Sequence, residues 1–76
     1  MSTIPLLSGQ EVAKVFEFFG WYVARQRGSH IIMVKKDHIA TLSIPDHKEV
    51  AKGTLRSLIR SADLTTAQFV KTIKKK

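Results

Sequence analysis

The sequence predicts an α+β fold, in which helices cover one face of a three-stranded antiparallel sheet and a short C-terminal helix follows. Three observations lead to this fold. Apolar residues recur at helical spacing on both sides of a central stretch, and that stretch is rich in β-branched and aromatic residues. The turns within it are too short for any but antiparallel neighbours. The 76 residues leave room for a single domain, which we assign to residues 1–76.

The first predicted element is a helix over Gly9–Phe19. Ser8 and Glu11 have the spacing of a capping box, in which each side chain accepts a hydrogen bond from the other residue's backbone amide. Gly20 stands where a left-handed residue commonly ends a helix. The apolar stripe of this helix consists of Val12, Val15, Phe16 and Phe19.

The central stretch contains three predicted strands, Trp21–Arg27, Ile31–Lys35 and Ile39–Ile44. Turn signals at Gly28-Ser29 and Lys36–His38 separate them. In the third strand, alternate residues are apolar, as expected when only one face of a sheet is covered. The three segments therefore form an antiparallel meander.

The chain leaves the sheet at Pro45, because proline has no N–H to donate to a strand ladder. A second helix begins near Gly53, and its apolar stripe would lie on the same sheet face as that of the first helix. Thr65 and Gln68 have the spacing of a second capping box, which predicts a third helix over Thr66–Ile73. The opposite face of the sheet is left free for a partner.

The chain is strongly basic, with 13 Lys and Arg against 6 Asp and Glu and a formal net charge of +7. Part of the excess lies in Lys74–Lys76. Such a charge attracts nucleic acid, an anionic membrane or an acidic protein. The absence of cysteine excludes thiol nucleophiles and cysteine-based metal sites. The apolar runs are too short to span a bilayer and the start lacks a secretion signal, so we expect a cytoplasmic protein without a membrane partner.

The densest group of chemically useful side chains lies between Arg25 and His30. Guanidinium groups grip phosphate in a fork, and imidazole exchanges a proton near neutral pH. These groups together can cut RNA, whose own 2′-hydroxyl attacks the adjacent phosphorus once its proton is removed. His30 is the candidate catalytic base. The candidate RNA-binding residues are Arg25, Arg27, Gly28, Ser29, Lys35 and Lys36.

These features also have structural interpretations. A Gly-Ser turn before a histidine is, by itself, more often an ordinary hairpin. His38 fits a structural role in a turn, and His47 can bind phosphate or cap its loop. Trp21 and Tyr22 can both stack on bases, but the place of Trp21 just after the first helix favours core packing. The histidines are irregularly spaced and the glycines isolated, so we expect neither a metal site nor a nucleotide or other small-molecule cofactor.

Several motifs keep the order and spacing of a known family. They are Ser8–Val12, Gly20-Trp21, Arg25–His30, Pro45–His47, Gly53–Arg56 and Phe69. Together they resemble the HicA family of toxin–antitoxin ribonucleases. The resemblance covers nearly the whole chain and is most specific in the Gly-Ser-His turn followed by Pro-x-His and Gly-Thr-Leu-Arg.

The resemblance implies a fold like that of a double-stranded RNA-binding domain. It also implies endoribonuclease activity on messenger RNA (mRNA) and neutralisation by a cognate HicB-like antitoxin that covers the active site. The family's catalytic histidine falls on His30, and a frequent family histidine falls on His47, to which we assign no catalytic role. The Lys36–His38 turn is shorter than in many family members, which leaves the substrate contacts at that end open.

Three functions follow from the sequence as hypotheses. The first is a metal-independent endoribonuclease in which His30 is the general base on the 2′-hydroxyl. His47, Lys35 and water are the candidates to protonate the leaving oxygen. A non-catalytic RNA-binding module explains the charge and the fold equally well, because such modules recognise duplex RNA largely by shape. An interaction protein would instead use the basic surface for an acidic protein partner.

Overall fold

The computed structural model describes residues 4–74, with side chains as far as Ile73. Met1–Thr3 and Lys75-Lys76, which include part of the basic tail, lie outside the described residues. No helix within the described range is long and apolar enough to cross a membrane. The elements, in chain order, are α1 (Gly9–Glu17), β1 (Tyr22–Arg27), β2 (His30–Val34), β3 (Leu42–Pro45), α2 (Lys52–Ser61) and α3 (Thr66–Lys74).

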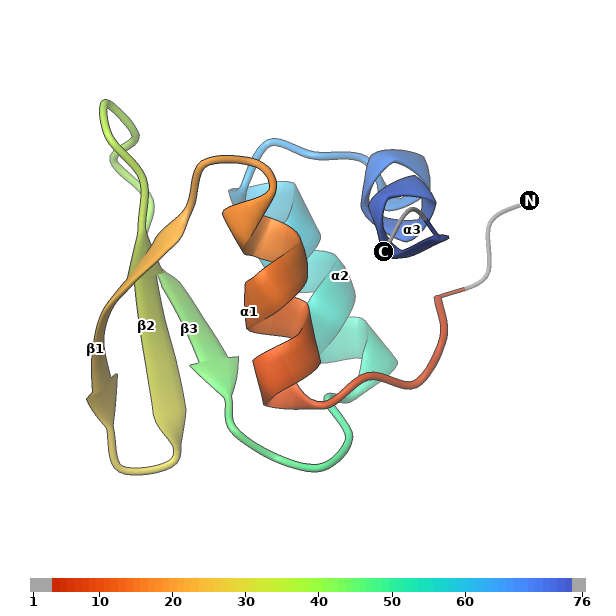
Figure 1. Ribbon diagram of the computed structural model, residues 1–76, viewed down its shortest axis with the longest axis horizontal. Helices are drawn as coiled ribbons and strands as arrows, with labels where there is room; N and C mark the ends of the chain where they lie inside the picture. The colour runs from red at the N-terminus through yellow and green to blue at the C-terminus, as the bar shows by residue number, and fades with distance from the viewer. Residues whose placement is uncertain (1–3, 75–76) are drawn as a thin grey trace.

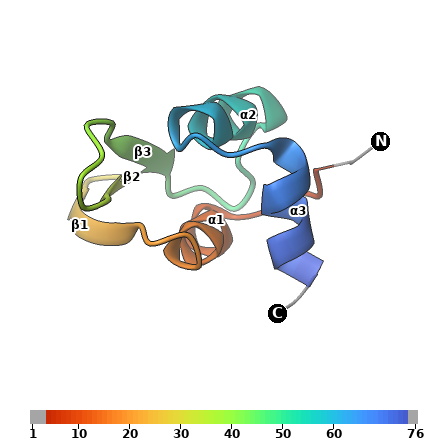
Figure 2. The same cartoon turned by 90° about the horizontal axis from the view of Figure 1, so that it is seen from above.

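The three strands form one antiparallel sheet in the order β1-β2-β3. Figure 1 shows α1 and α2 side by side on one face of this sheet, and Figure 2 shows the same layers from above. The third helix contacts α1 and α2 but no strand. The predicted α+β fold, with its α-β-β-β-α order and additional C-terminal helix, is confirmed.

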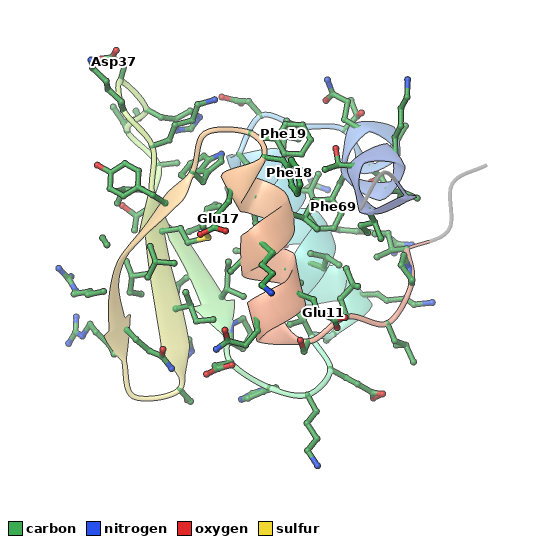
Figure 3. All side chains as sticks on the ribbon, viewed as in Figure 1. Glu11, Glu17, Phe18, Phe19, Asp37 and Phe69 are labelled. Atoms are coloured by element: carbon green, nitrogen blue, oxygen red, sulfur yellow. The ribbon has the colours of Figure 1, made fainter. Side chains whose placement is uncertain are left out.

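The core lies between the helices and the covered face of the sheet. Trp21 is 2% exposed, which confirms its prediction as a core residue. Its ring meets the ring of Phe16 edge-on at 6.5 Å, and Phe16 contacts Phe69 of α3 at 5.2 Å. Figure 3 shows Phe69 directed from α3 toward the helix layer. The sheet contributes the buried residues Ile31, Met33, Leu42 and Ile44.

The predicted helix caps are confirmed, although α1 ends at Glu17, two residues before the predicted Phe19. The Ser8 amide donates to the Glu11 carboxylate at 2.9 Å, and the Glu11 amide donates to the Ser8 hydroxyl at 3.1 Å. Gly20 has a φ of +95°, which L side chains rarely adopt, and it lies in the turn that follows α1. A second capping box precedes α3. The Thr65 amide donates to the Gln68 side-chain oxygen at 2.8 Å, and the Gln68 amide donates to the Thr65 hydroxyl at 3.1 Å.

The bounds of the third strand differ from the prediction. It begins at Leu42 rather than Ile39, because Ala40 donates its amide to the imidazole of His38 at 3.2 Å instead of to a strand. It also includes Pro45, which was predicted to lie outside the sheet. Asp46 donates its amide to the Ser29 carbonyl at 2.7 Å, so the nitrogen of the preceding Pro45 points away from β2. An edge strand tolerates proline at such a position.

Gly9 is required by close packing at the start of α1. A Cβ at this position would overlap the carbonyl oxygen of Pro45 and the Cα of Asp46. Both contacts are backbone atoms and cannot rotate away. We expect Gly9→Ala to lower the free energy of unfolding by about 1–3 kcal/mol, as measured by urea denaturation.

The matched control for Gly9→Ala is Gly53→Ala. Gly53 lies in α2, and a Cβ there would meet nothing within 4 Å. This control should leave the stability unchanged or raise it by up to about 1 kcal/mol. Equal effects of the two substitutions would contradict the packing argument.

Candidate active site

His30 is the first residue of β2 and the centre of the candidate site. Its Cα is paired with that of Arg27 on β1 and with that of Pro45 on β3. The side chain is exposed, and its ring forms no hydrogen bond or ion pair with any residue in the range 4–74. The backbone therefore fixes where His30 stands, while its imidazole nitrogens remain free to meet a ligand.

An open pocket of about 480 Å³ lies beside His30 on the sheet face that the helices leave uncovered. Ile32 and Ser43 are Cα partners on β2 and β3 and contribute to this pocket. The complete lining is Arg27, Gly28, His30, Ile32 and Ser43. The pocket thus combines an imidazole, a guanidinium, a hydroxyl and an apolar surface.

A β-bulge places both arginines of β1 on the face of His30. The pairing runs from Val23 opposite Met33 to Arg25 opposite Ile32, so Ala24 is the extra residue. Val23 therefore lies on the covered face with Met33, whereas Arg25 lies on the uncovered face. In a regular strand, Val23 and Arg25 would share one face, because they are two positions apart.

The arginines of this face have no protein partner among residues 4–74. Neither the Arg25 nor the Arg27 side chain forms an ion pair or a hydrogen bond there. Both are exposed. Their positive charge is therefore available to an anionic ligand, and a guanidinium presents paired donors that match the oxygens of a phosphate.

The predicted turn between β1 and β2 consists of Gly28 and Ser29. Gly28 has a φ of +55°, and a Cβ there would meet nothing within 4 Å, so the positive φ explains the glycine. The Ser29 carbonyl is held by the amide of Asp46. Gly28 lines the pocket, whereas Ser29 lies next to it in the turn.

Lys35 and Lys36 do not lie with the other predicted RNA contacts. They follow β2 at its far end, about 16–20 Å from His30 at the rise of an extended strand. Asp37, labelled in Figure 3, marks that end. The Cε of Lys35 lies 3.3 Å from the position that a Cβ would take on Gly20. The two lysines can therefore reach only a substrate that extends along the sheet.

His38 has the structural role that its sequence position predicted. Its Nδ1 accepts the amide of Ala40, so its Nε2 carries the proton and donates to the Asp63 carboxylate at 2.9 Å. Its ring also lies 4.9 Å from that of Trp21. Asp63 has a φ of +60° and is the second residue after α2. His38 thus joins the β2–β3 connection to the end of α2.

His47 does not line the pocket beside His30. Its side chain is exposed, and its carbonyl accepts the amide of Gly9 at 2.9 Å. Within residues 4–74, no three side chains of the metal-binding types come together.

Asp46 is the site residue that the sequence did not single out. Its carboxylate accepts the side-chain amide of Gln26 at 2.9 Å and that of Gln10 at 3.3 Å. Its backbone amide holds the turn at Ser29. Asp46 therefore connects α1, β1 and the turn that precedes His30. The sequence signal was an acidic residue beside Pro45. It did not reveal the role of Asp46, because the partners Gln10 and Gln26 are 36 and 20 positions away.

Comparison with known proteins identifies the family. The family model described as the HicA toxin of bacterial toxin–antitoxin matches residues 9–64. A solved toxin–antitoxin complex from Streptococcus pneumoniae has 32% sequence identity and a TM-score of 0.68, over 76% of this chain and 98% of that one. No curated protein matches the chain. The family match spans well over half of the chain and includes the His30 pocket, and the chain therefore belongs to the HicA toxin family.

Proposed function

We propose that this HicA family toxin is a metal-independent endoribonuclease that cleaves mRNA with His30 as its general base. One observation carries the proposal: His30 and Arg27 line the same pocket, and the ring nitrogens of His30 have no partner within the described range. Arg25, on the same face, is also unpaired within that range. A base and a phosphate-binding group thus stand where an extended RNA strand has access.

The reaction uses the nucleophile that RNA itself carries. His30 takes the proton of a 2′-hydroxyl, and that oxygen attacks the adjacent phosphorus in line with the 5′-oxygen. The bond from phosphorus to the 5′-oxygen breaks, which leaves a 2′,3′-cyclic phosphate and a 5′-hydroxyl. Arg27 and Arg25 stabilise the negative charge that accumulates on the phosphate oxygens.

The leaving 5′-oxygen also needs a proton. Lys35 lies beyond the far end of β2, and His47 does not line the pocket. Neither side chain is therefore assigned as the proton donor to the 5′-oxygen. Because the pocket is open, solvent water reaches the departing oxygen. We assign no side chain to this step.

We further propose that a HicB-like antitoxin binds the uncovered sheet face and that the toxin acts in the cytoplasm, where mRNA is translated. The similar solved structure is a toxin–antitoxin complex. The exposed cations of β1 that suit a phosphate also suit acidic side chains of a protein inhibitor. One surface then serves both substrate and antitoxin.

We expect His30→Ala to lower the rate of RNA cleavage by roughly 10²–10⁴-fold, because general-base catalysis contributes about that much. Because His30 is exposed, the variant should fold normally, which circular dichroism would verify. Cleavage of a synthetic RNA is followed by gel electrophoresis in the presence of a chelator. His47→Ala is the matched control and should retain activity.

Two outcomes would contradict this assignment. Undiminished cleavage by His30→Ala would remove His30 from the chemistry. Products with a 5′-phosphate rather than a 5′-hydroxyl would exclude attack by the 2′-oxygen. A wild-type protein that binds RNA without cutting it would favour the non-catalytic RNA-binding module.

The arginine contacts can be tested by the salt dependence of binding, measured in the His30→Ala background so that the RNA stays intact. Loss of one phosphate contact to single-stranded RNA should reduce the slope of log K against log salt by about 0.7. We expect this reduction for Arg27→Ala and for Arg25→Ala with a short RNA. Lys36→Ala should match them only with a longer RNA that reaches the far end of the sheet. Equal effects of all three with the short RNA would contradict the placement.

The antitoxin proposal predicts protection of the sheet face. When the product of a neighbouring small gene is co-expressed, it should co-purify with the toxin and abolish RNA cleavage. Amide hydrogen exchange should then slow in residues 25–32 more than in α3, because the partner covers that face. A stable complex that still cuts RNA would contradict this binding mode.

A further inference from the structure

A second pocket lies on the other side of β1, between that strand and α1. Its volume is about 300 Å³, at the lower end of the range for small-molecule sites. It is lined by Gln10, Ala13, Lys14, Glu17, Val23, Gln26 and Ile31. We call it the α1–β1 groove. The cleavage mechanism makes no use of it.

The α1–β1 groove has apolar walls. Ala13 and Ile31 belong to the core and come from α1 and β2, and Val23 is 45% exposed on β1. The bulge is the reason that Val23 is available here, because it turns Val23 to the helix side while Arg25 points to the other. A flat ring can therefore contact hydrocarbon inside the groove.

The amide groups of the α1–β1 groove have a fixed orientation. A carboxylate only accepts hydrogen bonds, so the nitrogens of Gln10 and Gln26 must both face Asp46. The carbonyl oxygens of the two amides then point away from Asp46 and are left for a ligand. Asp46 thereby sets which end of each amide a ligand meets.

The polar groups that remain are mostly acceptors. Glu17 adds a carboxylate, and Figure 3 shows its side chain on the side of α1 that faces the sheet. Lys14 supplies the cationic donor of the lining. A ligand that fits therefore has an apolar flat face, N–H donors on its edge and a nearby negative charge.

We propose that the α1–β1 groove binds a nucleobase with an exocyclic amino group, adjacent to the phosphate that is cut. This inference rests on the proposed function. Adenine, cytosine and guanine each offer an amino group to the glutamine carbonyls, whereas uracil has no amino group and offers a single ring N–H between two carbonyl oxygens. The groove thus selects against uracil.

The position of Gln26 connects the α1–β1 groove to the cleavage site. Gln26 lies between Arg25 and Arg27 along β1, with its Cα opposite Ile31, and lines the covered side. Because β1 is an edge strand, an RNA strand can cross it without meeting another strand. Phosphate then lies against the arginines while one base enters the groove. Lys14 is available to the next phosphate.

The test uses short RNAs that differ in one base at a time, with two readouts. Cleavage is measured with the wild-type chain, and binding is measured with His30→Ala. Both readouts should disfavour uracil at one position by about tenfold, within the discrimination that good paired base contacts provide. Gln26→Met keeps the length but removes the acceptor, and it should reduce the preference to less than about threefold.

Asp46→Asn provides an independent variant. An asparagine side chain both donates and accepts, so it no longer dictates the orientation of the glutamine amides. The preference against uracil should weaken even though the residue size is unchanged. Asp37→Asn is the matched control, because Asp37 is an exposed acid at the opposite end of the sheet, and it should keep the full preference.

The two readouts separate the two proposals. If the wild-type chain fails to cut RNA but binding still discriminates against uracil, the cleavage proposal falls and the base-binding groove stands. If uracil is accepted equally at every position, or if both Gln26→Met and Asp46→Asn retain the preference, the groove proposal is wrong while cleavage by His30 is unaffected.

Discussion

The contact between the start of α1 and the segment that follows β3 determines how the helix layer sits on the sheet. Gly9 donates its amide to the carbonyl of His47 and has no side chain to hold Pro45 away. Asp46, within the same segment, bonds to Gln26 of β1 and to the turn at Ser29. The first helix and the β1–β2 hairpin are therefore fixed to each other at the end of the molecule where His30 stands.

The uncovered face of the sheet follows from the size of the chain. A chain of 76 residues forms one core, and here the helices bury only one sheet face. The His30 pocket, on the other face, is therefore open to solvent. What the fold contributes at this pocket is therefore the positions of the groups around His30. The strands on either side supply these positions, because His30 is paired with Arg27 and with Pro45.

The sequence predicted the features that depend on local rules. Capping boxes and the left-handed Gly20 involve neighbours within four positions, and the Gly28-Ser29 turn involves adjacent ones, so the chain shows them directly. The role of Asp46 required knowledge of which distant segments meet. The bulge at Ala24 was also missed, because a period-two pattern assumes that pairing stays regular. Lys35 and Lys36 were grouped with His30 by charge, although strand length separates them.

The bulge gives one edge strand two different surfaces. Val23, before the bulge, lies on the side of α1. Arg25 and Arg27, after it, lie on the face of His30, where Arg27 is the residue opposite His30. A regular strand would put Val23 and Arg25 on the same face. Either an apolar residue would then lie among the exposed arginines, or a guanidinium would lie against the core. Because the bulge removes this conflict, β1 can hold cations toward one pocket and an apolar wall toward the other. The two pockets are lined by adjacent residues of this strand, Arg27 and Gln26.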